Sequence, residues 1–247
     1  MPEHNKKVAL ITGANRGIGF ETARQLGQKQ VTIVVGARSP ESAKETADKL
    51  TAQGIEAYPV VLDVTKEADR KAAASFIAKK FGRLDILINN AGIGGDGGLL
   101  NAHTISTSQD ELQRVFNTNL FSVVAVTREF LPLLKKSPAG RIVNLSSILG
   151  SLTLQAMPNS PIAPMKAFAY NASKTALNQF TVHLAAELKD TNIKVNSVHP
   201  GWVKTELGTQ HAQLEVADGA KTSVEFALLG ADGPSGKFVH DGQELPW

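Results

Sequence analysis

The sequence predicts an α/β protein built on a doubly wound parallel sheet. Seven short runs are rich in aliphatic and β-branched residues, and several are almost continuously apolar, as parallel strands covered on both faces are. Segments with helical signals lie between these runs, and a regular alternation of strands and helices builds parallel sheets. No linker or change of composition divides the 247 residues, so we expect a single domain over residues 1–247.

The expected elements follow one another along the chain. Ser39 and Pro40 are predicted as the N-cap and first residue of a helix, and Gly54 follows its end. The last long helix is expected over about residues 170–189. The seven predicted strands are residues 8–12, 31–37, 57–64, 84–91, 141–147, 193–200 and 237–242.

Two further helix starts and two long loops complete the outline. Thr65 stands in the cap position of a helical segment, and Ser108 and Glu111 have the spacing of a capping box. Residues 93–108 and 150–166 show no regular pattern. Long loops inside an α/β domain are usually functional or disordered.

Composition excludes several kinds of site. The net charge is only +3 and basic residues are mixed with acidic ones, so neither nucleic acid nor a membrane surface is an expected partner. There is no cysteine, which removes disulfides and a Cys nucleophile. The six histidines show no ligand spacing, and we expect no metal site. No signal-peptide-like region or membrane-spanning stretch is present, so we expect a cytoplasmic protein.

The first predicted strand runs directly into the glycine-rich stretch TGANRGIG, residues 12–19. Glycines here let the backbone turn tightly and approach a pyrophosphate closely, and the next helix offers its N-terminal N–H groups. The spacing differs from the GxGxxG of many dinucleotide sites, but its place between strand and helix still predicts one. The turn residues expected to hold the cofactor are Gly13, Asn15, Arg16, Gly17, Ile18 and Gly19.

Two arginines indicate which dinucleotide binds. An NAD site places an acid at the end of the second strand, where it accepts from the ribose 2′-hydroxyl. Here that strand ends in GARS, residues 36–39, without an acid. Arg38 in this stretch and Arg16 in the glycine turn can instead meet a 2′-phosphate through charge-assisted hydrogen bonds. We therefore expect NADP(H) as the cofactor.

Seven motifs occur in order along essentially the whole chain. They are TGANRGIG (12–19), Asp63–Val64, NNAG (89–92), Asn119, NLSS (144–147), YNASK (170–174) and PGWVKT (200–205). Together they resemble the motifs of the short-chain dehydrogenase/reductase family, and most closely those of its NADPH-dependent carbonyl reductases. The resemblance implies a Rossmann-type fold with about seven parallel strands, and hydride transfer between a nicotinamide and a carbonyl or alcohol carbon.

The resemblance also implies further cofactor contacts. Asp63 and Val64 match the adenine-contacting pair of the family, and PGWVKT matches the segment that wraps the nicotinamide. Lys174 is implied to bind the nicotinamide ribose, beside Tyr170. The other residues implied to contact the cofactor are Asn90, Ala91, Gly92, Pro200, Gly201, Val203 and Thr205.

Tyr170 and Lys174 are predicted to be the proton donor and its tuning cation. Reducing a carbonyl needs a hydride at carbon and a proton at oxygen, and a nicotinamide supplies only the hydride. A neutral tyrosine can donate the proton, although its ordinary pKa is about 10. Lys174 lies one helical turn after Tyr170, where its charge is expected to lower the Tyr170 pKa towards working pH.

Ser147 and Asn119 complete the predicted catalytic set. Ser147 ends a strand at the carboxyl edge, where its hydroxyl can hold the substrate oxygen, and Ser146 should point the other way. The resemblance selects Ser147 and implies that Asn119 anchors a proton-relay water; alternatively, Asn119 is a core amide satisfied by backbone. With Ser147 and Tyr170, Trp202 is an expected substrate contact, and residues 207–214 are an expected apolar lid.

The stretch QAMPNSPIAPMK, residues 155–166, departs from the family, whose loop before the tyrosine is usually shorter. We expect it to line the substrate entrance, so neither the exact substrate nor the oligomeric state follows from relatives, and a homo-oligomer stays open. The expected substrate is a small ketone or aldehyde. A 3-oxoacyl-acyl-carrier-protein reductase and a non-enzymatic NADP(H)-binding regulator are the alternatives. His199 either packs at its strand end, which we favour, or touches cofactor or substrate.

Overall fold

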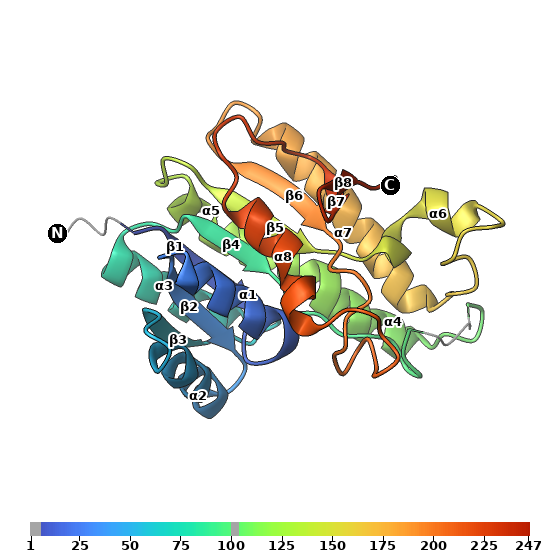
Figure 1. Cartoon of the computed structure of the whole chain (residues 1–247), viewed down its shortest axis with the longest axis horizontal. Helices are drawn as coiled ribbons and strands as arrows, with labels where there is room; N and C mark the ends of the chain where they lie inside the picture. Colours follow the sequence, from blue (N-terminus) through green and yellow to red (C-terminus); the bar gives the residue numbers. More distant parts are fainter. Residues whose placement is uncertain (1–5, 100–103) are drawn as a thin grey trace.

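The computed structural model describes residues 6–99 and 104–247, and one eight-stranded sheet runs through them (Figure 1). The strand order is β3-β2-β1-β4-β5-β6-β7-β8. All neighbouring strands are parallel except β7 and β8. The strands are β1 (Val8–Thr12), β2 (Thr32–Ala37), β3 (Ala57–Val61), β4 (Ile86–Asn89), β5 (Arg141–Leu145), β6 (Lys194–Val198), β7 (Phe238–His240) and β8 (Gln243–Glu244).

The predicted α/β class and doubly wound parallel sheet are confirmed. Each of the seven predicted runs contains a strand, and most strands are shorter than the run. The expected number of about seven parallel strands is confirmed by β1 to β7, and β8 adds a short antiparallel strand beside β7. With only two residues, β8 has no alternation that a sequence pattern could reveal.

Helices cover both faces of the sheet (Figure 1). Neighbouring residues of β1 face opposite sides, since Leu10 belongs to one buried cluster and Ile11 to the other. The helices on the Ile11 side are α1 (Gly17–Gln28), α2 (Pro40–Thr51) and α8 (Val216–Ala227), and those on the Leu10 side are α3 (Glu67–Phe81), α5 (Ser122–Leu134) and α7 (Phe168–Glu187). No helix within residues 6–99 and 104–247 is long and apolar enough to cross a membrane.

Helix starts test the predicted caps. Ser39 accepts from the N–H of Ser42 at 3.1 Å, which confirms it as a cap, and the Ser108 hydroxyl likewise accepts from the N–H of Glu111, at the start of α4 (Gln109–Phe116). The prediction for Thr65 is wrong: α3 begins at Glu67, after Lys66 as N-cap. The Thr65 hydroxyl instead donates to a carboxylate in the preceding turn, as short polar side chains often do outside helices.

The carboxyl ends of the parallel strands form the edge on which the functional loops gather. The strand order reverses between β1 and β4, and ligands of open α/β sheets bind in the crevice at such a reversal. Of the two predicted loops, residues 150–166 contain the short helix α6 (Leu152–Ala156) followed by turns. Part of the other loop, residues 100–103, lies outside the described residues.

Candidate active site

The glycine turn after β1 is shaped to receive a phosphate group. Gly13 and Gly17 have φ angles of +64° and +54°, in the left-handed region that favours glycine. A Cβ on Gly19 would lie 2.5 Å from both Gly13 O and Asn90 Nδ2, so a side chain does not fit there. α1 begins at Gly17 without a side-chain cap or an acid in its first turn. An N-terminus left open in this way suits the pyrophosphate of a dinucleotide.

The segment after β4 is fastened to this turn. The Thr12 hydroxyl accepts from the N–H groups of Asn90 and Ala91 at 3.0 Å each. The Asn90 side chain donates back to Thr12 O at 2.8 Å and to Gly13 O at 3.1 Å. The loops after β1 and β4 therefore form one unit, on which the predicted cofactor contacts Asn90 and Ala91 lie beside the glycines.

The two arginines expected to meet a 2′-phosphate follow the ends of adjacent strands. Arg38 follows β2 and is exposed. Arg16 immediately precedes α1, and its Nη1 lies 2.5 Å from Glu206 Oε2. Both side chains of this ion pair are more than half exposed, and such pairs contribute little stability. Arg16 thus has a weakly held partner that a phosphate can replace or join.

Asp63 and Val64 divide between the surface and the core. Asp63 Oδ1 accepts from the Thr65 N–H and hydroxyl at 3.1 and 2.7 Å. Burial would raise the Asp63 pKa, but these hydrogen bonds and the charges of Lys66 and Arg38 outweigh it, and the pKa is lowered. Val64 is buried in the apolar core. Of the pair expected at the adenine, only Asp63 keeps its side chain at the edge.

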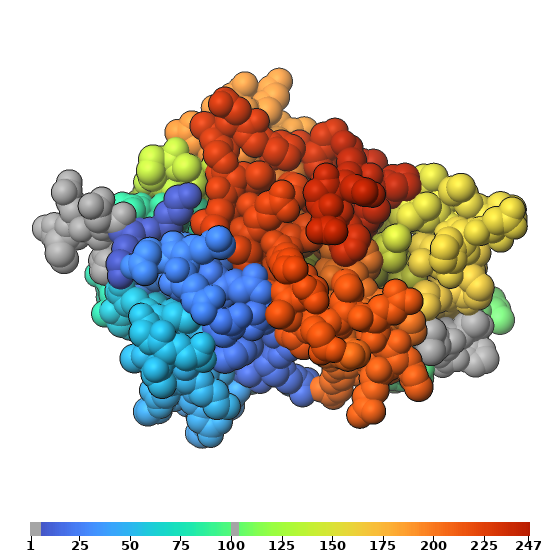
Figure 2. Space-filling view, viewed as in Figure 1, coloured from blue at the N-terminus to red at the C-terminus, as the bar shows by residue number. Residues whose placement is uncertain are grey.

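The loop after β6 bends over the glycine turn. Gly201 has a φ of +86°, and a Cβ there would lie 2.3 Å from Leu214 Cδ1. Val203 is buried, whereas Thr205 Cγ2 lies 3.5 Å from the place of a Cβ on Gly17. In Figure 2 this loop (orange) lies against the N-terminal segment (blue). Of the predicted contacts in PGWVKT, Thr205 is therefore the side chain next to the glycine turn.

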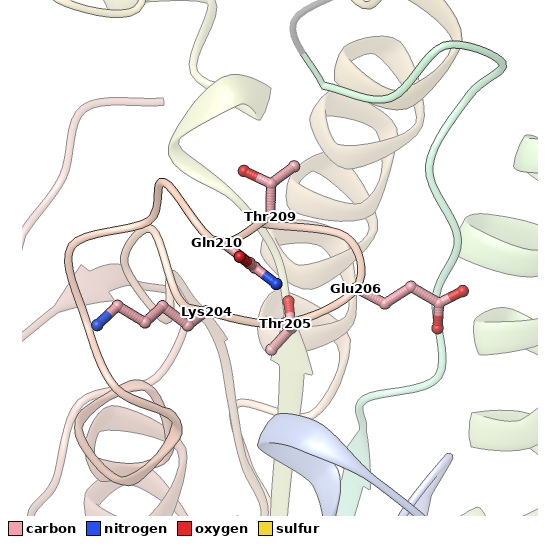
Figure 3. Close-up of a pocket in the computed structure, with 5 residues that line it drawn as sticks. All are labelled: Lys204, Thr205, Glu206, Thr209 and Gln210. Carbon is pink, nitrogen blue, oxygen red and sulfur yellow. The ribbon is translucent and has the colours of Figure 1, made fainter.

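A cavity of about 790 Å³ opens on the same loop (Figure 3). Its lining residues are Lys204, Thr205, Glu206, Thr209 and Gln210. Trp202, predicted as a substrate contact, donates from Nε1 to Gly208 O at 2.6 Å and so braces the loop from within. Leu207 packs against the apolar cluster that contains Tyr170. Of the expected apolar lid, Leu207 thus lies against the cluster around Tyr170, whereas Thr209 and Gln210 line the cavity.

Tyr170 and Lys174 are both buried on α7, with 5% of each residue exposed. Lys174 Nζ lies 5.6 Å from the Tyr170 ring centroid and donates to Leu145 O at 2.7 Å. Burial raises the Tyr170 pKa to about 12, against a lowering hydrogen bond with Ser147, and burial lowers the Lys174 pKa to about 8. Among the protein's own groups, burial thus overrides the expected lowering of the Tyr170 pKa by Lys174.

The two serines after β5 point in different directions. Ser147 interacts with Tyr170, and its hydroxyl accepts from the Leu149 N–H at 3.2 Å. Ser146 donates to Asn178 Oδ1 at 2.6 Å. Ser147 is therefore the serine next to the phenolic hydroxyl, which is the place of a group that holds a carbonyl oxygen.

Asn119 lies in a π-helical turn, Asn117–Phe121, between α4 and α5. Such turns inside helices frequently mark functional sites. The Asn119 amide is fully buried, donates to Ile93 O and accepts from the Ile93 N–H, each at 2.9 Å. Gly92 adjoins it: a Cβ there would lie 3.4 Å from Asn119 Oδ1 and 3.6 Å from Lys174 Nζ. Asn119 thus has the backbone partners of a core amide, and its side chain lies on the same side of Gly92 as the Lys174 amine.

Sequence reasoning missed Ser173, which joins two predicted site residues. Its hydroxyl accepts from Asn119 Nδ2 at 3.0 Å and donates to Tyr170 O at 2.7 Å. The only signal was its place three residues after Tyr170 in YNASK.

His199 packs its ring against His240, with centroids 4.8 Å apart, as a strand-end residue would. Burial and the charge of His240 lower the His199 pKa to about 3.

No metal site is found: among the described residues, no three His, Asp or Glu side chains are grouped so that they could hold a metal ion.

Replacing Lys174 by Met should make the dependence of stability on pH weaker. Below pH 8 the Lys174 amine is charged in both the folded and the unfolded state, and burial of this charge destabilises the folded state. Between pH 8 and 10.5 the unfolded state binds more protons than the folded state, so the stability of the wild type rises with pH. Between pH 8 and 10.5 the free energy of unfolding of the wild type should therefore rise by up to about 3 kcal/mol relative to that of Lys174→Met, which lacks the titrating group. Urea unfolding at several pH values measures this, and Lys189→Met, at an exposed position of the same chain, is the control for removal of a lysine.

Comparison with known proteins agrees with this geometry. Residues 7–215 match the model of a family described as short chain dehydrogenase. Carbonyl reductase (NADPH) 1 of Mus musculus is 32% identical, covering 98% of this chain and 99% of its own. Short-chain dehydrogenase anuI of Penicillium roqueforti is 36% identical, covering 97% and 96%. The NADPH-bound carbonyl reductase from chicken fatty liver superposes with a TM-score of 0.84 at 29% identity, covering 98% and 99%.

Proposed function

Because this chain belongs to the short-chain dehydrogenase family, we propose that it reduces a ketone or aldehyde to an alcohol with NADPH, in a reversible reaction. The observation that carries the proposal is the buried Tyr170 hydroxyl, which interacts with Ser147 on the same sheet edge as the glycine turn. Carbonyl reduction requires a proton donor of this kind beside a binding site for the nicotinamide cofactor.

The cofactor would be held by the turn and loops at the carboxyl edge. The open N-terminus of α1 and the glycines of the turn bind the pyrophosphate, and Lys174 holds the ribose beside the nicotinamide. Arg16 and Arg38 bind the 2′-phosphate, and Asp63 lies at the adenine. The NADPH in the names of the mouse and chicken relatives supports the same cofactor.

The chain's own residues supply the proton and orient the substrate. When bound, the nicotinamide supplies the hydride. Ser147 donates to the carbonyl oxygen, and Tyr170 gives that oxygen its phenolic proton; the raised pKa keeps this proton on Tyr170 at neutral pH. Lys174 stabilises the phenolate left behind, and Asn119, fixed by Ile93, supports the return of a proton from solvent.

The direct test is a panel of aldehydes and ketones, with NADPH oxidation followed by absorbance. Turnover of a small carbonyl, with NADPH preferred to NADH, supports the proposal. Turnover only of a 3-oxoacyl thioester on an acyl carrier would assign the carrier-protein reductase. Tight NADPH binding without oxidation by any substrate would favour a regulator.

A further inference from the structure

The segment that departs from the family, residues 155–166, forms a loop closed at its base. Lys166 Nζ donates to Gln155 O at 2.9 Å and to Gln155 Oε1 at 2.7 Å. Gln155 Nε2 donates to Met165 O at 3.2 Å. Three hydrogen bonds thus join the two ends of the segment, and the residues between them have a fixed starting point.

Consecutive turns shape the loop above this base. The Ser160 N–H donates to Met157 O at 3.1 Å, and the Ala163 N–H donates to Ser160 O at 3.0 Å. Pro158 and Pro161 occupy the second positions of these turns, where the fixed φ of proline favours the turn. Proline at a compatible position also reduces the freedom of the unfolded chain. The loop is therefore a pre-organised element.

The catalytic helix α7 contacts both the chain that leads into the segment and the end of the segment. Thr175 Oγ1 donates to Gly150 O at 2.9 Å, and a Cβ on Gly150 would lie 2.8 Å from the carbonyl carbon of Lys174. At the other end, Asn171 Nδ2 donates to Met165 O at 2.8 Å. These anchors adjoin Tyr170 and Lys174 in sequence, so the helix that carries the proton donor also positions the loop.

Ile162, in the second half of the loop, is only 8% exposed. It belongs to one buried apolar cluster with Leu149, Ala167 and Tyr170. Partly buried apolar residues from three loops pack against this cluster: Leu99, Ile148, Leu154, Met165 and Leu207. The surroundings of the Tyr170 ring are therefore mainly aliphatic, and Ile162 is the buried member of the cluster that the departing segment contributes.

We infer that Ile162 is a specificity-determining residue that forms an apolar wall beside Tyr170 and selects carbonyl substrates with hydrocarbon rather than polar substituents. The inference rests on the proposed function, which places the carbonyl oxygen at Ser147 and Tyr170. With the oxygen held there, the carbon substituents face the aliphatic cluster. Each methylene buried in such surroundings raises kcat/KM about fourfold, whereas a polar substituent loses its hydration.

The test measures kcat/KM of the full-length enzyme for the aldehydes from butanal to octanal. In the wild type, kcat/KM should rise about fourfold per methylene. Ile162→Thr keeps the branch at Cβ but removes the Cδ1 methyl and places a hydroxyl in the wall, and the rise should fall below about twofold per methylene. NADPH affinity, measured by fluorescence titration, should stay unchanged, since residues 155–166 are remote in sequence from the glycine turn and contribute none of the predicted cofactor contacts.

Leu152→Thr is the matched control, because Leu152 lies three residues before the segment, at the start of α6, but is 65% exposed. It should leave the chain-length dependence intact. A flat dependence in the wild type, an unchanged dependence in Ile162→Thr, or an equal loss in Leu152→Thr would overturn the inference while leaving carbonyl reduction in place. If no carbonyl is reduced at all, the proposed function itself fails.

Lys166→Met provides a second, independent variant that keeps every residue of the cluster but removes two of the three hydrogen bonds at the base of the loop. Since this change loosens the wall without touching the proton donor, the KM for octanal should rise while kcat stays within about twofold. An unchanged KM for octanal, or an equal rise for butanal, would contradict the assigned role of the loop.

Discussion

Tyr170→Phe is expected to lower kcat for carbonyl reduction by at least about 100-fold, which is the usual contribution of a positioned general acid. The change removes only the phenolic O–H, which interacts with Ser147. The ring keeps its place in the apolar cluster around Tyr170, so folding and NADPH affinity should change little. Single-wavelength NADPH absorbance gives the rate, and fluorescence titration gives the affinity.

Tyr58→Phe is the matched control for this result, because Tyr58 and Tyr170 are the two tyrosines of the chain. Tyr58 lies on the outer strand β3, and its hydroxyl is 3.1 Å from Glu56 Oε1. Its loss should not affect the rate. If Tyr170→Phe kept more than about a tenth of the wild-type kcat, the proton would have to come from another group. If it lost NADPH binding as well, Tyr170 would be a cofactor-binding residue first.

The sequence predicts the sheet and the location of the site for one physical reason. Strands buried on both faces are rich in apolar residues, so β1, β2, β4 and β5 are visible as short runs. In a parallel sheet the residues that follow these runs converge on one edge. The glycine turn after β1 and Ser147 after β5 could therefore be assigned to one site without knowledge of side-chain positions.

Burial depth and packing between distant segments could not be predicted in this way. The four-residue spacing of Tyr170 and Lys174 indicates that they share a helix face, but only the structure shows that both are buried, which reverses the expected direction of the Tyr170 pKa shift. The sequence around Asn119 has no residue pattern that distinguishes a π-helical turn from an ordinary helix. Ile162 lies in an irregular stretch, and the cluster that buries it is also covered by Leu99 and Leu207 from two other loops.

Local competition explains the remaining differences. Thr65 has a residue type suited to an N-cap, but the carboxylate of Asp63 lies two residues earlier and accepts hydrogen bonds from its hydroxyl and N–H.

α8 was not predicted at all: it starts without a side-chain cap and contains Gly219, which lowers intrinsic helix propensity. Its stability comes from packing of its apolar residues, such as Val224, on the sheet.

Arg38→Asp is expected to change the choice of cofactor. If Arg38 binds the 2′-phosphate, its loss removes a hydrogen bond to a charged group and adds a repulsive carboxylate, so NADPH affinity should fall at least about 10-fold. NADH carries no 2′-phosphate, and an acid at the end of β2 can accept from its ribose hydroxyl. Its affinity should therefore hold or rise. Fluorescence titration with both dinucleotides measures the two effects separately.

Arg128→Asp controls for the change in net charge, since Arg128 is also exposed but lies on α5, on the opposite face of the sheet from α1 and α2. A general effect of charge would weaken NADPH binding in both variants, and it would decline with added salt. A specific effect appears only in Arg38→Asp. Equal losses of affinity for NADPH and NADH in that variant would mean that Arg38 does not bind the 2′-phosphate. Arg16, once released from Glu206, would then be the remaining candidate for this contact.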